Sequence, residues 1–476
     1  MEHVLNWNLA HQRFFEEMTK IPHGSFHEEA YSAYLEEFAK AHQFDYERDE
    51  KNNVIIRKPA SKGYEDHKPV ILQAHMDMVC EKNRDVDFNF ETDALNLYIE
   101  DGYLKARGTT LGADDGVGDA YMLALLDDPE AKHPMLECIF TVQEEVGLFG
   151  ALALKKEQLH ATRMINLDDG GETVSCMSSA GGMNVILTKP NLQAPCSEQG
   201  YQLDVKGLKG GHSGGEIDKE RGNANRLVAR VLHALNKHYG IQLHDFEGGD
   251  KDNAIPREST AVFVTDAPFE KIEQKVAEFD AIFKKEYEFS DAGVEVFVKP
   301  VEVTEAMSIE DTENIIHFMM CAPDGLHHHS MSIEGLSTAS NNLAVIHCKE
   351  DVMINVSLRG ALESYVDDLA EQMDVLADTF GFETAHEARY PAWSYDEHSE
   401  LRDVMKTVCK RLYGQELELI AVHGGLECGV FKALVPEMEI VTMGPIMYDI
   451  HTPQERLNVE SFDRTFVFLK EFLEAL

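Results

Sequence analysis

The sequence predicts an α/β protein with a mostly parallel sheet, helices on both faces of that sheet, and an inserted α+β domain. Apolar, β-branched segments alternate with helical segments near both ends of the chain, which is typical of a parallel sheet covered by helices. Between about 185 and 386 the pattern changes, because no probable strand there ends in paired carboxylates followed by glycine. The length of 476 residues suffices for two or more domains. We therefore expect one domain from 1–184 and 387–476, and a second from 185–386.

The elements of the first segment follow from apolar spacing and from residues that end helices. Residues 5–20 have the pattern of an amphipathic helix, which Pro22 ends. Ser25–Glu28 matches a capping box, which predicts a second helix through Ala41. The elements expected after it are strands at 54–56 and 69–75 and a helix at 119–126.

The same reasoning gives the elements of the other two segments. In the inserted segment we expect strands at 258–265, 294–299, 343–348 and 352–359, and helices at 219–237, 269–286 and 363–379. After it we expect a helix at 398–412, strands at 417–422 and 438–443, and a closing helix at 459–475. The histidine run 327–329 lies among Gly, Asp and Ser without a carboxylate at ligand spacing, so a solvated loop is expected there.

The charge of the chain excludes several classes of partner. Lys and Arg number 43 against 85 Asp and Glu, which gives a net charge of −42. Such a surface repels nucleic acid and anionic membranes, so we expect neither as a partner. The start of the chain lacks the basic and apolar regions of a signal peptide, and the eight cysteines form no C-x-x-C pair. These features favour a cytoplasmic protein with reduced thiols.

Glu144 and Glu145 form the most informative pair of residues. They follow the apolar run 139–142 and precede Gly147, so they are expected at the carboxyl edge of a sheet. Adjacent carboxylates repel, and a metal ion would compensate if one carboxylate bound it while the other moved a proton. Because side chains alternate along a strand, the two would point in different directions. The alternative is a solvated pair at a strand end.

Three further motifs place acids or histidines where predicted strands meet loops. His75 and Asp77 follow the strand at 69–75, although H-x-D alone is as compatible with a structural role. Asp114 and Asp115 lie in a glycine-rich loop that lacks the G-K-[ST] ending of a phosphate-binding loop. Asp168 ends another apolar run, and the late histidines include His451. Mixed imidazole and carboxylate donors suit zinc, or manganese or cobalt.

The order H-x-D, G-x-D-D-G, E-E, D and a late His resembles the co-catalytic di-zinc peptidases, which include aminoacylases and related carboxypeptidases. Three longer strings resemble the branch of cytosolic aminoacyl-histidine (Xaa-His, non-specific) dipeptidases. These strings are Gly108–Gly116, Gly210–Gly215 and His423–Gly429. The resemblance covers essentially the whole chain and implies a catalytic domain with 185–386 as its lid.

The resemblance also implies roles at matching positions. Asp114 would bridge two zinc ions, with His75 and Asp168 completing one site and Glu145 and His451 the other. Asp77 would orient His75 through its second ring nitrogen, and Glu144 would be the general base for a metal-bridging water. In the lid, His212 would stabilise the oxyanion, while Asn342 and Arg359 would hold the substrate carboxylate. A homodimer is expected.

Asp115 stands where this branch often has Asn, and we expect it to lie near the metals without binding them. Two alternatives stay open. A scaffold protein could keep the fold without turnover, although all five expected ligands, Asp77 and Glu144 are present. An N-acyl amino acid amidohydrolase or a tripeptidase could use the same metal chemistry.

Overall fold

The computed structural model describes residues 3–331, 333 and 335–476, and these divide into two compact units. Unit 1 contains the chain up to Ser179 together with Trp393–Ala421 and Leu426–Leu476, and unit 2 contains Ala180–Ala392 together with Val422–Gly425. Unit 2 therefore begins before residue 185 and ends after residue 386. It also takes in residues 422–425, which were expected in the other domain.

The main sheet of unit 1 is mostly parallel, with β2 as its one antiparallel strand among the described residues. Among the described residues it has six strands in the order β1-β2-β6-β3-β7-β23. Strands β6, β3, β7 and β23 are mutually parallel, whereas β1 and β2 pair antiparallel at one edge. The bounds are β1 Asp45–Arg48, β2 Val54–Lys58, β3 Val70–His75, β6 Leu136–Thr141, β7 Arg163–Asn166 and β23 Glu439–Thr442. The α/β class is confirmed.

Apolar sequence explains why these strands lie in the middle of the unit. Every residue of β3 and β6 is buried, as expected for runs covered on both faces. Helix α3 is apolar over most of its surface and packs against β3 and α1. The helices of this unit are α1 Ala10–Met18, α2 Glu29–His42, α3 Ala113–Asp127, α4 Phe149–Ala153, α9 Glu400–Tyr413, α10 Glu427–Leu434 and α11 Val459–Ala475.

Two expectations about the first helices were wrong. The helix expected at 5–20 is shorter, since the backbone is helical only over Ala10–Met18. The predicted capping box does not form, because α2 begins at Glu29 and has no side-chain cap. The hydroxyl of Ser25 donates instead to Asp77 Oδ2 at 2.7 Å. A side chain that looked like a local helix cap thus serves a long-range contact.

Two smaller sheets complete unit 1. One has the order β24-β25-β5-β4 and brings the loop that contains His451 next to the segment before Asp114. The other pairs β22 with β8. The bounds are β4 Leu97–Glu100, β5 Tyr103–Ala106, β8 Val174–Ser179, β22 Glu418–Val422, β24 Met447–Tyr448 and β25 Arg456–Asn458.

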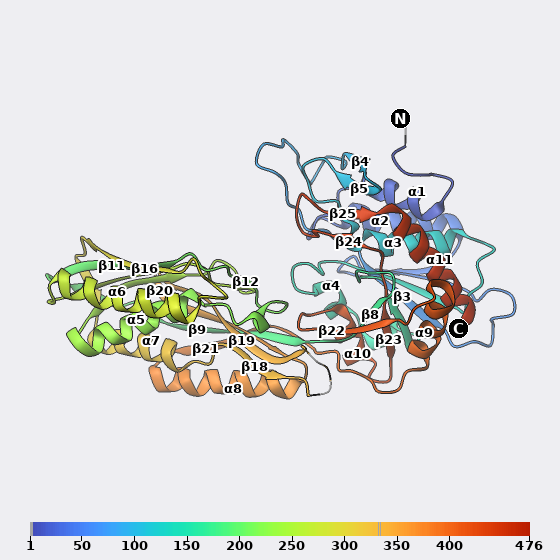
Figure 1. Cartoon of the computed structure of the whole chain (residues 1–476). Helices are drawn as coiled ribbons and strands as arrows, with labels where there is room; N and C mark the ends of the chain where they lie inside the picture. The colour runs from blue at the N-terminus through green and yellow to red at the C-terminus, as the bar shows by residue number, and fades with distance from the viewer. Residues whose placement is uncertain (1–2, 332, 334) are drawn as a thin grey trace. The chain divides into compact units, whose positions relative to one another are not determined.

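Unit 2 contains one large antiparallel sheet in the order β16-β11-β15-β13-β19-β20-β9-β21, with β18 paired to β19. Helices α5 to α8 pack on this sheet (Figure 1). The strands are β9 Gly181–Pro190, β11 Gln199–Lys206, β13 Gln242–Gly248, β15 Ser259–Thr265, β16 Glu295–Val301, β18 Gly325–His329, β19 Ser337–Cys348, β20 Asp351–Gly360 and β21 Glu383–Tyr390. The helices are α5 Ala224–Tyr239, α6 Phe269–Glu286, α7 Ile309–Cys321 and α8 Glu363–Phe380.

The sheet of unit 2 is built from two halves with the same topology. One half runs β11-α5-β13-β15-α6-β16, and the other runs β9-α7-β19-β20-α8-β21. In each half the first strand pairs with the third and fourth, and the second lies beyond the third. The halves join through their second strands, β13 and β19, at the pair Gly248↔Ile346. One half is inserted in the sequence between β9 and α7 of the other.

The sequence missed several elements of this unit. Strands β9, β11 and β13 and helix α7 were not predicted, although the predicted strands and helices listed for this segment are present. The histidine run 327–329 lies in strand β18 rather than in a loop, and His328 stacks on Tyr365. Its strand character comes from pairing with β19, which local composition does not reveal.

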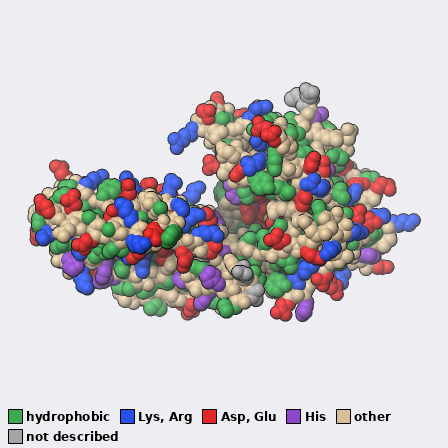
Figure 2. Space-filling view, in the orientation of Figure 1, with side chains coloured by type: hydrophobic (Ala, Val, Ile, Leu, Met, Phe, Trp, Pro, Cys, Tyr) green, Lys and Arg blue, Asp and Glu red, His purple; other side chains and the backbone are tan. Residues whose placement is uncertain are grey.

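Charged side chains cover much of the molecular surface. Acidic and basic side chains are interspersed on the face seen in Figure 2, with acidic groups in excess over the whole sequence. No helix within the described ranges is long and apolar enough to cross a membrane. All eight cysteines lie within the described residues, and no disulfide joins any of them.

Candidate metal centre

The ends of three adjacent parallel strands place the predicted acids and His75 at one edge of the sheet. His75 is the last residue of β3 and pairs with Thr141, the last residue of β6. On the other side, Gln73 of β3 pairs with Asn166, the last residue of β7. The chain that follows β6 carries Glu144 and Glu145, and the chain that follows β7 carries Asp168. Ligands of open α/β sheets bind at this carboxyl edge.

Asp114 occupies the centre of this cluster. Its Oδ1 lies 3.1 Å from His75 Nε2, and its Oδ2 lies 3.1 Å from His451 Nε2. The two oxygens of one carboxylate thus face two different imidazoles. This is the arrangement expected of a carboxylate that bridges two metal ions.

The remaining predicted ligands lie beside the two imidazoles. Asp168 Oδ1 is 4.0 Å from His75 Nε2, and Glu145 Oε1 is 2.8 Å from His451 Nε2. Within the described chain, ligand atoms of His75, Asp114 and Asp168 lie within 4.8 Å of one another, as do those of Asp114, Glu145 and His451. The structure therefore brings all five predicted ligands into two groups that share Asp114.

The electrostatics of these groups favour bound cations. Burial raises the pKa of Asp168 well above its usual range, and the neighbouring Asp114 carboxylate adds to the rise. Hydrogen bonds to Asp114 and Glu145 raise the pKa of His451 to about 11. The negative charge of these carboxylates thus favours a proton or a cation at the centre of the cluster. Two divalent ions held by imidazole and carboxylate donors would fit this arrangement.

Glu144 lies beside the ligands but in a different setting from Glu145. Both follow the end of β6 in a turn, so strand alternation does not separate them as expected. Ligand atoms of Glu144, Glu145 and His75 all lie within 4.8 Å of one another, and Glu145 alone of the two glutamates also belongs to the group with Asp114 and His451. Burial raises the pKa of Glu144 well above its usual range, and the Asp168 and Glu145 carboxylates contribute. Such a carboxyl is suited to accept a proton near neutral pH.

Asp77 has more partners than predicted. His75 Nδ1 lies 2.9 Å from the backbone carbonyl oxygen of Asp77 and 3.6 Å from its carboxylate Oδ1. The carboxylate accepts the backbone N–H of Glu144 at 2.9 Å and that of Glu145 at 3.3 Å. Asp77 therefore holds the turn of the glutamate pair through its side chain and faces His75 mainly through its backbone.

Asp115 is buried and does not belong to either ligand group. Its Oδ1 accepts the backbone N–H of Gly118 at 3.2 Å, inside the first turns of α3. Asp115 is thus the chain neighbour of the predicted ligand Asp114, while its carboxylate contacts the helix.

Two buried glutamates near the ligands were missed. Glu455 accepts backbone hydrogen bonds from the loop that leads to Asp114. Glu427 accepts hydrogen bonds from Gln73 and Thr141, which are polar residues inside the apolar strands β3 and β6. Gln73 and Thr141 were the available signal, because a buried polar side chain in a central strand requires a partner.

The three residues predicted for the lid lie in unit 2, and each has a different environment. His212 is exposed on strand β12, Gly211–His212, and its Nδ1 accepts the backbone N–H of Gly215 at 3.0 Å. Arg359 on β20 is buried and donates from Nη1 to the Tyr390 hydroxyl at 3.0 Å, while its Nε has no hydrogen-bond partner among the described residues.

Asn342 on β19 is almost fully buried, and its amide is already used. Its Nδ2 donates to the carbonyl oxygens of Ala254 at 2.8 Å and Asp252 at 3.3 Å. Its Oδ1 accepts from Asn223 Nδ2 at 3.3 Å. The geometry assigns Asn342 to holding the loop before Ile255, next to the strand that carries His212.

His423 also belongs to this part of unit 2, and its place was not foreseen. Its Nε2 lies 2.7 Å from Ser340 Oγ, and it is buried. Burial, together with the nearby Arg359 guanidinium, lowers the pKa of His423 to about 3. The imidazole is therefore neutral at physiological pH.

A family model described as peptidase family M20/M25/M40 matches residues 71–475. The chain belongs to peptidase family M20/M25/M40. The resemblance seen in the sequence is thereby confirmed, and the match spans every predicted ligand. The chain is therefore a peptide hydrolase.

Relatives within the family share nearly the whole length of the chain. The cytosol non-specific dipeptidase of Escherichia coli strain K12 is 35% identical over 467 residues, which cover 97% of this chain and 96% of the relative. The crystal structure of an aminoacylhistidine dipeptidase from Vibrio alginolyticus has a TM-score of 0.86 and 33% identity, covering 98% of this chain and 96% of that one.

A more distant match to the fold is the crystal structure of human carnosine dipeptidase 1. It has a TM-score of 0.52 and 12% identity, and the match covers 98% of this chain and 97% of that structure. This likeness shows the fold alone. The relatives at 35% and 33% identity carry more weight for a proposal about activity.

Proposed function

We propose that this M20 peptidase hydrolyses the peptide bond of dipeptides, Xaa-His dipeptides among them, with two zinc ions as cofactors. Manganese or cobalt would suit the same donors. One observation carries the proposal: the two oxygens of Asp114 face the imidazoles of His75 and His451, each at 3.1 Å. The similarity to the cytosol non-specific dipeptidase of Escherichia coli and the aminoacylhistidine dipeptidase of Vibrio alginolyticus supplies the dipeptide class.

The described residues suggest how the ions would be held. His75 and Asp168 would bind one ion, Glu145 and His451 the other, and Asp114 both. Two divalent ions, when bound, supply Lewis acidity and lower the pKa of water, so that a nucleophile is available at neutral pH. Asp77 would keep the ligands in place, because it contacts His75 and the backbone of Glu144 and Glu145.

Glu144 is the proposed general base. Its carboxyl lies beside the ligand cluster without completing either group that contains Asp114. It would take a proton from the attacking water and deliver that proton to the leaving amine nitrogen as the C–N bond breaks. A raised pKa suits both halves of this transfer.

Unit 2 supplies the proposed contacts to the rest of the substrate. Arg359 would bind the carboxylate of the dipeptide, since its guanidinium has an unsatisfied donor at Nε. His212 would stabilise the developing oxyanion. Asn342 would act by holding the neighbouring loop, because its amide already bonds to Ala254 and Asp252. We also propose that unit 2 is a mobile lid.

The cellular setting follows from the relatives. The dipeptidase of Escherichia coli is named a cytosol enzyme, and we propose a cytoplasmic location for this chain as well. A homodimer stays our prediction for the assembly, to be checked by sedimentation of the zinc-loaded protein.

A substrate panel tests the proposed function. The zinc-loaded protein would be assayed with Xaa-His dipeptides, other dipeptides, tripeptides and N-acetyl amino acids at equal concentration. We expect dipeptides to have the highest kcat/KM. Preference for N-acetyl amino acids or for tripeptides would replace the proposal by an amidohydrolase or tripeptidase function.

A further inference from the structure

A connected group of buried polar side chains lies one layer beneath the metal centre. Gln73, Thr141 and Asn166 come from the adjacent strands β3, β6 and β7, and Glu427 is the first residue of α10. All four side chains are completely buried. Burying such a polar group without a hydrogen bond costs about 1–3 kcal/mol of folding free energy. Each of the four side chains makes at least one hydrogen bond within the network, and Glu427 Oε1 has no partner among the described residues.

The hydrogen bonds of this network run across all three strands. Glu427 Oε2 accepts from Gln73 Nε2 at 2.5 Å and from Thr141 Oγ at 2.7 Å. Gln73 Oε1 accepts from Asn166 Nδ2 at 2.8 Å. The Glu427 carboxylate therefore holds the ends of β3 and β6 directly, and it holds the end of β7 through Gln73.

Each strand member of the network lies just before a residue of the metal centre. Gln73 precedes His75 by two positions, so both side chains project from the same face of β3. Asn166 precedes Asp168 by two positions, and its Oδ1 accepts the backbone N–H of Asp168 at 3.3 Å. Thr141 pairs with His75 across the sheet. Movement of this layer would therefore displace the ligand side chains.

We propose that Glu427 is a positioning residue for the metal centre, acting through Gln73, Thr141 and Asn166 to fix the spacing of the three strand ends. The proposal rests on the metal site of the proposed function. Metal affinity depends on the placement of ligands, and loss of an outer partner of a ligand typically costs 10–100-fold in affinity or activity. Glu427 would exert this effect without binding a metal.

A matched control exists on the same strand as Thr141. Glu137 of β6 is also completely buried, but it lies toward the opposite end of the strand. Its carboxylate accepts from Arg57 Nε at 3.0 Å and from the backbone N–H of His160 at 2.9 Å. Glu137→Gln therefore disturbs a buried glutamate of the same sheet without touching the layer beneath the ligands.

The test compares zinc affinity, measured by competition with a chromophoric chelator, in the wild type, Glu427→Gln and Glu137→Gln. We expect Glu427→Gln to lower the affinity for at least one zinc ion by about 10–100-fold. Excess zinc should restore much of kcat, and KM should change little. Glu137→Gln should lower the melting temperature without changing zinc affinity.

Thr141→Val provides a second variant that removes a single donor to Glu427 and keeps the shape of the side chain. It should shift zinc affinity in the same direction by a smaller factor. Unchanged zinc affinity in both Glu427→Gln and Thr141→Val would overturn the proposal, as would an equal loss in Glu137→Gln. The two proposals can fail separately. If Glu427→Gln binds zinc more weakly but the wild type cleaves no dipeptide, this inference is supported and the dipeptidase function is overturned.

Discussion

The carboxylate of Glu455 accepts the backbone N–H of Ala113 at 2.8 Å, immediately before the proposed bridging ligand. It also accepts the N–H groups of Leu111 at 2.6 Å and Gly112 at 3.1 Å. Glu455 follows His451 by four positions, so one short segment provides a proposed ligand and also holds the loop of Asp114. The two halves of the proposed binuclear site are thereby tied together by a buried side chain.

Glu455→Gln should loosen this loop. The amide group of Gln would meet backbone N–H donors where the carboxylate had acceptors, which leaves buried donors unsatisfied. We expect the free energy of unfolding of the metal-free protein to fall by about 1–3 kcal/mol, measured by urea denaturation. Glu460→Gln, at an exposed position on α11, is the control and should leave stability nearly unchanged. Equal stability of the two variants would contradict this account of Glu455.

Metal content is the next prediction. After dialysis with zinc and removal of unbound metal, we expect close to two equivalents per chain, because two ligand groups share Asp114. Treatment with a strong chelator should abolish peptide hydrolysis, and added zinc should restore it. Activity that survives complete removal of metal would refute the proposed chemistry.

The adjacent glutamates should respond differently to the same substitution. Glu144→Gln keeps the size of the side chain but cannot accept a proton, so kcat should fall by about 10²–10⁴-fold with both zinc ions retained. Glu145→Gln weakens a zinc site, because Glu145 Oε1 lies beside His451 Nε2. Excess zinc should then partly rescue Glu145→Gln only. The measurement is kcat together with zinc content on one Xaa-His dipeptide, and reversed behaviour of the two variants would exchange their roles.

The sequence revealed the proposed ligands more readily than the buried residues that hold them in place. His75, Asp114 and Asp168 follow apolar runs or lie among glycines, and these are local patterns. Glu427 and Glu455 gave no such pattern, because their partners lie hundreds of positions away along the chain. Long-range hydrogen bonding is invisible to spacing, and for the same reason Ser25 was taken for a helix cap.

For the fold, too, local sequence predicted individual elements but not the pairing of distant ones. Central strands such as β3 were predicted because continuous apolar sequence marks them, whereas β1 and β2 were not expected to pair antiparallel. In unit 2 the repeated topology of the two halves was missed. Strands such as β11 and β13 mix buried apolar residues with half-buried polar ones and contain no distinctive motif. Pairing between distant strands, which defines that topology, requires the three-dimensional structure.

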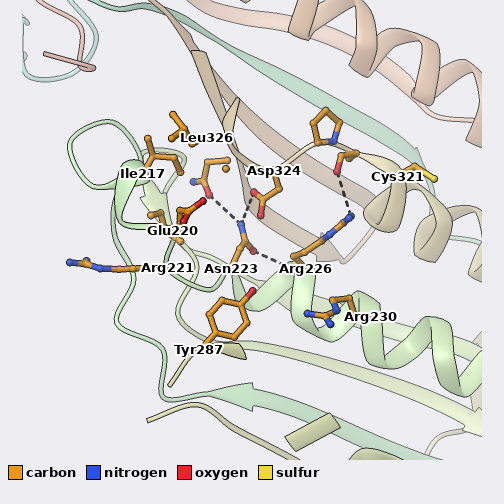
Figure 3. Close-up of a pocket in the computed structure, with 15 residues that line it drawn as sticks. Ile217, Glu220, Arg221, Asn223, Arg226, Arg230, Tyr287, Cys321, Asp324 and Leu326 are labelled. Carbon is orange, nitrogen blue, oxygen red and sulfur yellow. Dashed lines mark hydrogen bonds between the residues drawn. The ribbon is translucent and has the colours of Figure 1, made fainter. Parts of the chain in front are cut away.

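The last prediction concerns a carboxyl in unit 2, far along the sequence from the metal ligands. Asp324 lines a cavity of about 530 Å³ together with Arg226 and Tyr287 (Figure 3). Its Oδ1 accepts from Leu343 N at 3.0 Å and from Asn223 Nδ2 at 3.1 Å. Burial nevertheless raises the pKa of Asp324 to about 6, against an ordinary value of 3.8. The folded chain thus binds a proton here that the unfolded chain releases at lower pH.

The sign of the effect on stability follows from that difference. Between about pH 4 and pH 6 the folded state binds more protons at Asp324, so this group lowers stability as pH rises, and the loss persists above pH 6. Asp324→Asn cannot ionise and keeps an oxygen for Leu343 and Asn223. The variant should therefore be more stable than the wild type by about 1–3 kcal/mol at pH 7.5, with the gain shrinking toward pH 4.5. Melting temperatures across this range provide the measurement. Asp378→Asn, at an exposed position on α8, is the matched control. A gain independent of pH, or the same gain in the control, would show that ionisation of Asp324 is not its cause.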